Sequence, residues 1–573
     1  MNNTNHIQDA PLASEMPPWW RGAVVYQVYP RSLMDSTGDG VGDLPGITQR
    51  LDYIASLGVD AVWVSPFFKS PMKDFGYDVS DFRAVDPLFG ELGDFDRLVA
   101  AAHAQDLKVL IDLVPSHTSD EHPWFQDSRA RRDGRDDWYV WADASDDGGP
   151  PNNWLSVFGG SAWEWDAQRS QYYLHNFLAS QPDLNFHCVA VQDQILDELT
   201  FWLRRGVDGF RLDAVNYCFH DAQLRDNPLK PKEERKGRGF SPDNPYAWQY
   251  HRYDNTQPEN LKFLTRVRRL LDQYPGTVAL GEINSDDSNA TIAEYTNGND
   301  RLHMGYSFEL LADECSPAFI RDTVADLESR LESGWPCWAI SNHDVVRVAT
   351  RWATDGASPA RARLFTAMVC SLRGTICTYQ GEELGLTQAE IARDQLQDPF
   401  GINFWPSFKG RDGCRTPMPW HNREPGAGFS SGDPWLPIPE QHRARSVAQQ
   451  EDDEQSVLNH YRRFLSWRKN QPALMWGSQE FVDTPTSVLG FVREYGDQRL
   501  LVLMNFAGEP VEVPLPAPWR LTRVGSRSGQ TIRGSVVLKA FEPWFGDLAL
   551  DAVFAGGRGD TLPDSEARQE LTP

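Results

Sequence analysis

Four short segments place a carboxylate, or a residue able to assist one, directly after an apolar run that is typical of a strand. They are DLVPSH with Asp112 and His117, GFRLD with Arg211 and Asp213, ALGEIN with Glu282, and ISNHD with His343 and Asp344. In a barrel of alternating strands and helices, the residues just past the carboxyl ends of the strands meet at one face, whatever their separation in sequence. We therefore expect Asp213, Glu282 and Asp344 to share one site.

The types of these residues point to acid and base chemistry. Carboxylates crowded on one concave floor repel each other, so one of them is expected to keep its proton near neutral pH. Paired Asp and Glu side chains of that kind catalyse glycoside hydrolysis. We expect Arg211 to lower the pKa of Asp213 and keep it ionised as a nucleophile. We expect burial to raise the pKa of Glu282 and make it a proton donor.

Each motif also has a structural explanation when it is taken alone. Arg211 and Asp213 could form an ordinary ion pair at a strand end. Glu282 could be a structural carboxylate, and Asp344 could cap the helix that follows it. The expected convergence of all three carboxylates favours the catalytic interpretation.

Composition and charge exclude several classes of partner. The chain has 573 residues and a formal net charge of −26, so nucleic acid and anionic membranes would be repelled, whereas a neutral sugar would not be. Residues 1–20 have neither the basic nor the apolar region of a signal peptide, and no apolar stretch reaches the ~18 residues of a membrane span. We expect a cytoplasmic protein that binds small neutral oligosaccharides. Its oligomeric state is not indicated.

The cysteine and tryptophan counts add two expectations. The seven cysteines are an odd number without C-x-x-C spacing, so we expect reduced, mostly buried thiols rather than disulfides or a zinc site. The 21 tryptophans are numerous, and aromatic faces stack on sugar rings, so their number favours a carbohydrate substrate.

The elements that must position the carboxylates alternate between strands and helices. Helical spacing links Phe95, Leu98, Val99 and Ala102, with Asp94 as the expected N-cap, and it recurs over 195–203. Near-continuous apolar runs, typical of buried parallel strands, occur at 24–29, 61–65, 108–114, 208–215, 277–283, 305–311, 338–341 and 375–379. Eight strands separated by helices predict an α/β fold of the (β/α)8 TIM barrel type.

Two connections are too long for a simple barrel, and the pattern changes near the C-terminus. We expect the first part of the barrel at 1–117, an inserted subdomain B at 118–181 after the third strand, and the rest of the barrel at 182–477 with an irregular lid at about 216–273. Short strands without helices predict an antiparallel β-sandwich module at 478–553. Residues 554–573 are expected to form a mobile tail.

The order and intervals of LIDLVPSH, GFRLDAV, LGEIN and ISNHD resemble the α-amylase superfamily of retaining α-glycoside hydrolases, glycoside hydrolase family 13. QPDLN at 181–185 is similar to its oligo-1,6-glucosidase and α-glucosidase branch. The resemblance covers residues 19–550 approximately. The five motifs in this order specify the family, although any one of them alone would be weak evidence. It implies that Asp213 is the nucleophile, Glu282 the acid/base, and Asp344 the carboxylate that orients the 2- and 3-hydroxyls of glucose. The residues implied to hold the sugar in subsite −1 are His117, Arg211 and His343.

The same resemblance extends to the substrate pocket. KDFGYDV at 73–79 resembles the stretch in which Tyr77 stacks on the sugar and Asp74 binds its 4- and 6-hydroxyls. Arg411 in GRDGCRTPMPW resembles the arginine that pairs with that aspartate beyond the non-reducing end. An Asp/Arg pair there leaves no room for another glucose unit and hydrogen-bonds a terminal hydroxyl bidentately, which implies exo action. A surface ion pair is the alternative for Asp74 and Arg411, and a core Tyr is the alternative for Tyr77. Phe158 and Phe177, in the inserted subdomain, are candidates for apolar walls of the pocket.

The loop DSTGDGVGD has the oxygen spacing of the front of a calcium loop, although Gly46 stands where an EF-hand has its bidentate Glu. The resemblance implies one structural Ca²⁺ or Mg²⁺ here, and a polar hairpin is the alternative. The expected ligands are Asp35, Thr37, Asp39, Asp43 and the carbonyl of Val41. The family's other calcium site usually has Asn where this chain has Ser116, so a second ion would lack a ligand.

Together these features predict an α-glucosidase that works by double displacement without an organic cofactor. We expect hydrolysis of terminal α-1,4 bonds in short substrates such as maltose, with transfer of glucose to other hydroxyls. An oligo-1,6-glucosidase or a sucrose-type glucosyltransferase would use the same residues. In the family, Val after the nucleophile accompanies α-1,6 activity, and Ala214 stands there in this chain. A non-catalytic relative, such as the heavy subunit of amino-acid transporters, would need a membrane anchor, and a sugar-binding module would not require Glu282.

Overall fold

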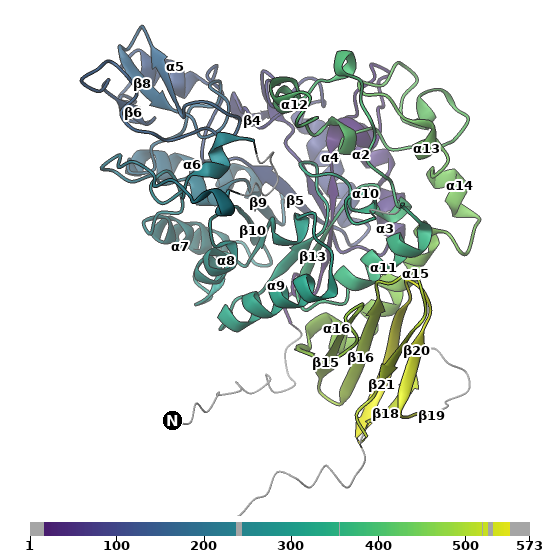
Figure 1. Cartoon of the computed structure of the whole chain (residues 1–573). Coiled ribbons are helices and arrows are strands. Elements are labelled where there is room, and N and C mark those ends of the chain that lie inside the picture. Colours follow the sequence, from purple (N-terminus) through teal and green to yellow (C-terminus); the bar gives the residue numbers. More distant parts are fainter. Residues whose placement is uncertain (1–16, 236–242, 354–355, 518, 525–530, 551–573) are drawn as a thin grey trace, which may run out of the picture.

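The structure, a computed structural model, describes residues 17–235, 243–353, 356–517, 519–524 and 531–550. Eight parallel strands form one sheet in the order β11-β10-β9-β5-β2-β1-β13-β12, and a parallel bridge between Gly305 and Pro336 joins its two edges. The predicted TIM barrel is therefore confirmed (Figure 1). The barrel strands are β1 Val24–Val28, β2 Ala61–Val64, β5 Lys108–Leu113, β9 Gly209–Leu212, β10 Val278–Ile283, β11 Met304–Ser307, β12 Cys337–Ala339 and β13 Thr375–Tyr379.

Alternation along these strands divides the core into two clusters, because successive side chains point to opposite faces of a sheet. Tyr26 and Val62 pack in the layer between sheet and helices, whereas Val25 and Trp63 pack in the smaller cluster inside the barrel. This double burial explains the continuous apolar runs. All seven cysteines are free thiols, five of them buried and two half-buried, as the sequence predicts.

Helices surround the barrel and follow the strands in sequence. The N-terminus of α4 differs from the prediction: Glu91 is the N-cap, and Asp94 is the third helical residue, whose side chain binds back to the N-cap backbone in a capping box. The main helices are α2 Leu44–Gln49, α3 Leu51–Ser56, α4 Leu92–His103, α6 Val189–Leu203, α7 Asn260–Leu271, α8 Ser288–Thr296, α9 Pro317–Arg330, α11 Pro359–Val369 and α15 Val457–Lys469.

A small insertion interrupts the barrel between β5 and α6. It contains α5 Pro123–Arg129 and an antiparallel sheet of β6 Trp141–Ala142, β8 Gln171–Leu174 and β7 Trp163–Asp166. Figure 1 places this insertion far from the C-terminal strands. A separate pair, β3 Phe68–Lys69 and β4 Asp81–Val85, follows β2.

The long connection after β9 is irregular only in its first part. It contains the short 3-10 turns η1 Val215–Tyr217, η2 Lys232–Glu234 and η3 Pro245–Trp248 before α7 begins at Asn260. The prediction of an irregular lid as far as 273 was therefore too long. α7 buries Phe263, Leu264, Val267 and Leu271, a helical spacing that fits a barrel helix. Residues 236–242 of the predicted lid lie outside the described part of the chain.

The C-terminal strands form an antiparallel sheet in the order β14-β15-β16-β21-β18-β19, beside a two-stranded pair of β17 and β20. β21 pairs with both β16 and β18. The predicted tail 554–573 lies outside the described residues. No helix in the described ranges is long and apolar enough to cross a bilayer. The strands are β14 Ser478–Phe481, β15 Val488–Tyr495, β16 Gln498–Asn505, β17 Val511–Pro514, β18 Trp519–Arg523, β19 Thr531–Ile532, β20 Ser535–Leu538 and β21 Pro543–Leu550.

Candidate active site

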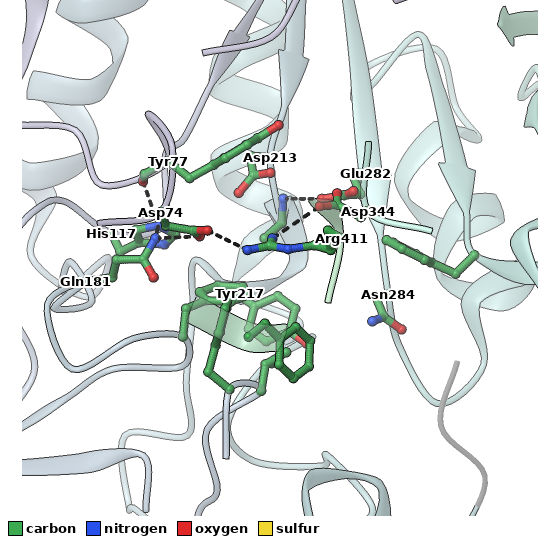
Figure 2. Close-up of a pocket in the computed structure, with 16 residues that line it drawn as sticks. Asp74, Tyr77, His117, Gln181, Asp213, Tyr217, Glu282, Asn284, Asp344 and Arg411 are labelled. Carbon is green, nitrogen blue, oxygen red and sulfur yellow. Dashed lines mark hydrogen bonds and ion pairs between the residues drawn. The ribbon is translucent and has the colours of Figure 1, made fainter. Parts of the chain in front are cut away.

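One pocket lies at the carboxyl ends of the barrel strands, with a volume of about 790 Å³ including its open mouth. All three predicted carboxylates line it: Asp213 follows β9, Glu282 lies near the end of β10, and Asp344 follows β12 (Figure 2). The other lining residues are Asp74, Tyr77, His117, Val157, Phe158, Phe177, Gln181, Ala214, Tyr217, Asn284, Phe308, Phe400 and Arg411.

The guanidinium of Arg211 joins three carboxylates at the pocket floor. Its Nη1 donates to Asp112 Oδ1 at 2.8 Å and also to Asp213 Oδ1, while its Nη2 lies 2.5 Å from Glu282 Oε1. Arg211 is completely buried. Because a single guanidinium carries one positive charge, three anions around it would leave a buried excess of negative charge. The cluster therefore favours retention of a proton.

The pKa values follow from this shared charge. Burial raises the pKa of Asp213 to about 7 and that of Glu282 to about 7, although Arg211 acts in the opposite direction on both. Arg211 lowers the pKa of Asp213, as predicted, but desolvation outweighs this attraction, which is divided among several acids, so the expected net lowering of the Asp213 pKa was wrong. The predicted rise for Glu282 agrees with the structure.

Asp344 has the opposite character. Burial would raise its pKa, but His343, Arg411 and Arg415 outweigh that effect and hold the pKa of this carboxyl well below its usual range. Its Oδ1 accepts hydrogen bonds from Arg411 at 3.2 Å and from Arg415 at 2.9 Å. Asp344 is thus the carboxylate that stays ionised, while the proton belongs to the cluster around Arg211.

The far end of the pocket contains the predicted pair of Asp74 and Arg411, with Nη2 and Oδ1 2.7 Å apart. Asp398, which the sequence did not single out, binds the same guanidinium through two contacts, of 2.8 Å from Nη2 and 3.2 Å from Nε. The Phe158 ring centroid lies 5.3 Å from the guanidinium carbon. Arg411 is therefore fixed by carboxylates and an aromatic face.

The rings of Tyr77 and His343 lie parallel, with 5.3 Å between their centroids. Gln27 donates to His343 Nδ1 at 2.8 Å. Since burial lowers the pKa of His343 to about 3, the ring is neutral and carries its proton on Nε2. That nitrogen faces the Tyr77 hydroxyl at 2.6 Å.

His117 lies beside these residues and is also neutral, because burial lowers its pKa to about 4. Its Nε2 contacts the Tyr77 carbonyl at 3.1 Å, and its ring centroid lies 5.1 Å from that of Phe177. Phe158 and Phe177 both line the pocket, where the sequence predicted apolar walls. Among the described lining residues none is Trp, so the expectation drawn from the tryptophan count does not apply to this pocket.

Six lining residues were not predicted, and three of them lie inside sequence segments that carry other predicted features. Gln181 opens QPDLN and donates to Asp74 at 3.2 Å, Asn284 closes LGEIN, and Phe308 lies in GYSFELL. These segments therefore held the signal. Val157 and Tyr217 lie in the long connections between barrel elements, and Phe400 lies in the short helix α12 Pro399–Phe404; no periodic pattern marks any of the three.

The loop predicted to bind a metal is closed by its own hydrogen bonds. Asp35 Oδ1 accepts from the N–H groups of Thr37 and Gly38, at 2.9 and 2.7 Å, and Asp39 Oδ1 accepts from that of Val41 at 2.9 Å. Asp43 is the N-cap of α2. Within the described ranges, no group of three or more His, Cys, Asp or Glu side chains is placed to hold an ion. The ion in this loop stays a prediction.

Comparisons with known proteins agree with this architecture. Residues 27–477 match the family described as alpha amylase, catalytic domain, and 479–532 match the maltogenic amylase C-terminal domain. A probable alpha-glucosidase of Rhizobium meliloti (strain 1021) is 56% identical, covering 87% of this chain and 91% of its own length. An oligo-1,6-glucosidase of Bacillus cereus is 33% identical, with 87% and 92% covered. The crystal structure of the alpha-glucosyl transfer enzyme XgtA superposes with a TM-score of 0.90 at 61% identity, over 93% of this chain and 100% of that one.

Proposed function

Because the chain belongs to the α-amylase catalytic-domain family, we propose that it is a retaining, exo-acting α-glucosidase that removes the terminal α-1,4-linked glucose of short substrates such as maltose. The observation that carries this proposal is the bridge of Arg211 between Asp213 and Glu282. One guanidinium holds both carboxyl groups near each other, as a nucleophile and a proton donor on opposite sides of one bond require.

In the first step, Asp213 attacks the anomeric carbon of the bound glucose while Glu282 donates its proton to the glycosidic oxygen. A bond forms between Asp213 and C1, the glycosidic bond breaks, and the leaving sugar departs as a neutral alcohol. Glu282 is then ionised. In the second step it takes a proton from water, whose oxygen attacks C1 and releases Asp213 and α-glucose. Asp344, which stays anionic, would orient the ring hydroxyls.

The geometry at the opposite end supports exo action. Asp74 and Arg411 form an ion pair across the pocket, and Asp398 anchors Arg411 from behind. A terminal glucose would place its 4- and 6-hydroxyls against this pair, and no further glucose unit would fit beyond it. We propose that the Tyr77 ring stacks on that glucose, and that Phe158 and Phe177 form apolar walls beside it.

Two related activities use the same machinery. The similarity to an alpha-glucosyl transfer enzyme favours transfer of glucose to an acceptor hydroxyl in place of water. The similarity to an oligo-1,6-glucosidase keeps the α-1,6 bond as the alternative, whereas Ala214 after Asp213 favours α-1,4. The proposed partner is a small neutral oligosaccharide, and the cytoplasmic location stays a prediction.

A product time course on maltose, isomaltose and sucrose tests the proposal, with the anomer of the released glucose recorded by NMR or polarimetry. We expect maltose to be the best of the three, and the glucose derived from its non-reducing end, which is released from the glucosyl-enzyme, to be the α anomer. Release of that non-reducing-end glucose as the β anomer would exclude a retaining mechanism, and preferred cleavage of isomaltose would favour the α-1,6 alternative. Asp213→Asn provides the control, because this nearly isosteric change should abolish turnover while leaving the fold intact.

A further inference from the structure

A histidine outside the pocket lies behind one of the pocket walls. The wall residue is Tyr217, on the opposite side of the pocket from Tyr77 in Figure 2. Its hydroxyl lies 2.6 Å from that of Tyr246. The Tyr246 ring is stacked on His251, with centroids 3.7 Å apart and planes inclined by 20°. A continuous chain of contacts therefore runs from the pocket to His251.

Both ring nitrogens of His251 face hydrogen-bond acceptors. Nδ1 lies 2.6 Å from Asp254 Oδ2, and Nε2 lies 2.9 Å from the carbonyl oxygen of Tyr246. A neutral imidazole donates from only one nitrogen, so both contacts are hydrogen bonds only when the ring carries two protons. Burial lowers the pKa of His251, but Asp254 outweighs it and the pKa lies above the usual range. Asp254 is fully buried and needs this cation.

The same histidine is tied to the loop after β10. Its backbone N–H donates to Asp286 Oδ2 at 2.9 Å, and the other oxygen of Asp286 pairs with Lys230 at 2.7 Å. Asp286 follows Asn284, which lines the pocket, and Glu282 on β10. The charged and titratable groups facing His251 are thus Asp254 and Tyr246 from its own segment and Asp286, with its partner Lys230, from across the connection.

We propose that protonated His251 is a positioning residue, which holds the segment 243–256 against the loops after β9 and β10 and thereby fixes Tyr217 as a wall of the substrate pocket. This inference rests on the proposed glucosidase function, since the position of Tyr217 affects catalysis only if a sugar binds in the pocket. Loss of one ring proton breaks either the Asp254 or the Tyr246 contact. Because the ring is charged below its pKa, both ring hydrogen bonds form at low pH, and one of them is lost as the pH rises through the His251 pKa.

The test compares His251→Gln and Asp254→Asn with His187→Gln. The control residue His187 also binds the connection after β9, through the His220 carbonyl at 2.8 Å, but the contact involves no carboxylate. In the parent enzyme the KM for maltose should rise as the pH rises through the His251 pKa. His251→Gln should raise KM about tenfold at pH 6, the loss expected for a charged hydrogen bond, and remove its pH dependence. The pH profile of kcat should be unchanged, and the control should resemble the parent.

A readout independent of activity separates this inference from the proposed function. Hydrogen exchange in 243–256 should be faster in His251→Gln than in the parent at pH 6, and the difference should disappear as the pH rises through the His251 pKa. Equal protection of the two proteins at pH 6 would overturn the positioning role of His251. The same conclusion would follow if KM in His251→Gln kept the parent's pH dependence while kcat and the melting temperature fell together. If the parent does not cleave maltose at all, the proposed function fails, and the exchange comparison still decides the role of His251.

Discussion

The backbone N–H of Ala214 donates to Glu282 Oε2 at 3.2 Å, so the residue directly after Asp213 binds the carboxyl group of the neighbouring strand. Ala214 adopts a left-handed conformation with φ of 40°, which is uncommon for a residue other than glycine. Such a conformation costs roughly 1–2 kcal/mol and persists where the surrounding structure enforces it. The backbone as well as Arg211 therefore fixes how Asp213 and Glu282 face each other.

The positive φ of Ala214 predicts opposite effects on stability for two substitutions at this position. Ala214→Gly should be at least as stable as the parent, because glycine adopts positive φ without strain. Ala214→Val should lower the free energy of unfolding by about 1–3 kcal/mol, because a branched side chain is strained there. Denaturant unfolding of the pair measures this, and the isomaltose to maltose ratio of kcat/KM reports whether Val shifts the linkage preference. Equal stabilities would show that the backbone strain is not significant.

Glu282 predicts a pH dependence of activity. Since burial raises its pKa to about 7, the acid is protonated below that pH, and kcat/KM for maltose should fall as the pH rises through about 7. Glu282→Gln should reduce the glycosylation rate strongly for maltose, and much less for an aryl glucoside whose acidic phenol departs with little protonation. Pre-steady-state rates for both substrates provide the measurement. Equal losses for the two leaving groups would remove Glu282 from the role of acid.

Most of the barrel could be predicted because its strands are buried on both faces and therefore have continuous apolar runs. The same logic identified Asp213, Glu282 and Asp344, since position after a strand determines convergence in this fold. The net pKa shift of Asp213 could not be predicted, because it depends on how many acids share Arg211 and how deeply they are buried. The roles of Tyr217 and Asp398 were not predicted because both residues lie in irregular connections, where tertiary packing determines the contacts.

Asp398 should contribute to activity although it does not line the pocket. Asp398→Asn removes the charge that holds Arg411 from behind, so Arg411 should shift toward Asp74 and Asp344 and disturb both. We expect kcat/KM for maltose to fall by about 10- to 100-fold, the range for a lost hydrogen-bonded charge pair. Lys409→Ala is the control, because Lys409 is close in sequence and its pair with Glu390 is exposed. A similar effect of both substitutions would mean that Asp398 has no specific role.

The predicted ion in the loop from Asp35 to Asp43 can be tested by metal removal. An ion that binds only the folded state stabilises it by mass action, so exhaustive chelation should lower the melting temperature, and added Ca²⁺ or Mg²⁺ should restore it. Asp39→Asn should weaken this response. An unchanged melting temperature, together with elemental analysis that finds no divalent ion, would leave the hydrogen bonds to Asp35 and Asp39 as the whole basis of the loop's structure.

Substrate length should be limited by the connection between β9 and α7. Asp74 and Arg411 close one end of the pocket, and Tyr217 from this connection forms part of its wall, so we expect a second sugar to fit and a third to collide. The value of kcat/KM should then fall from maltose to maltotriose and again to maltotetraose. The same covering would exclude water and lengthen the life of the glucosyl-enzyme, which lets an acceptor hydroxyl compete. A flat or rising series across the three sugars would show that the connection does not limit length, and the expectation of transfer would lose its structural basis.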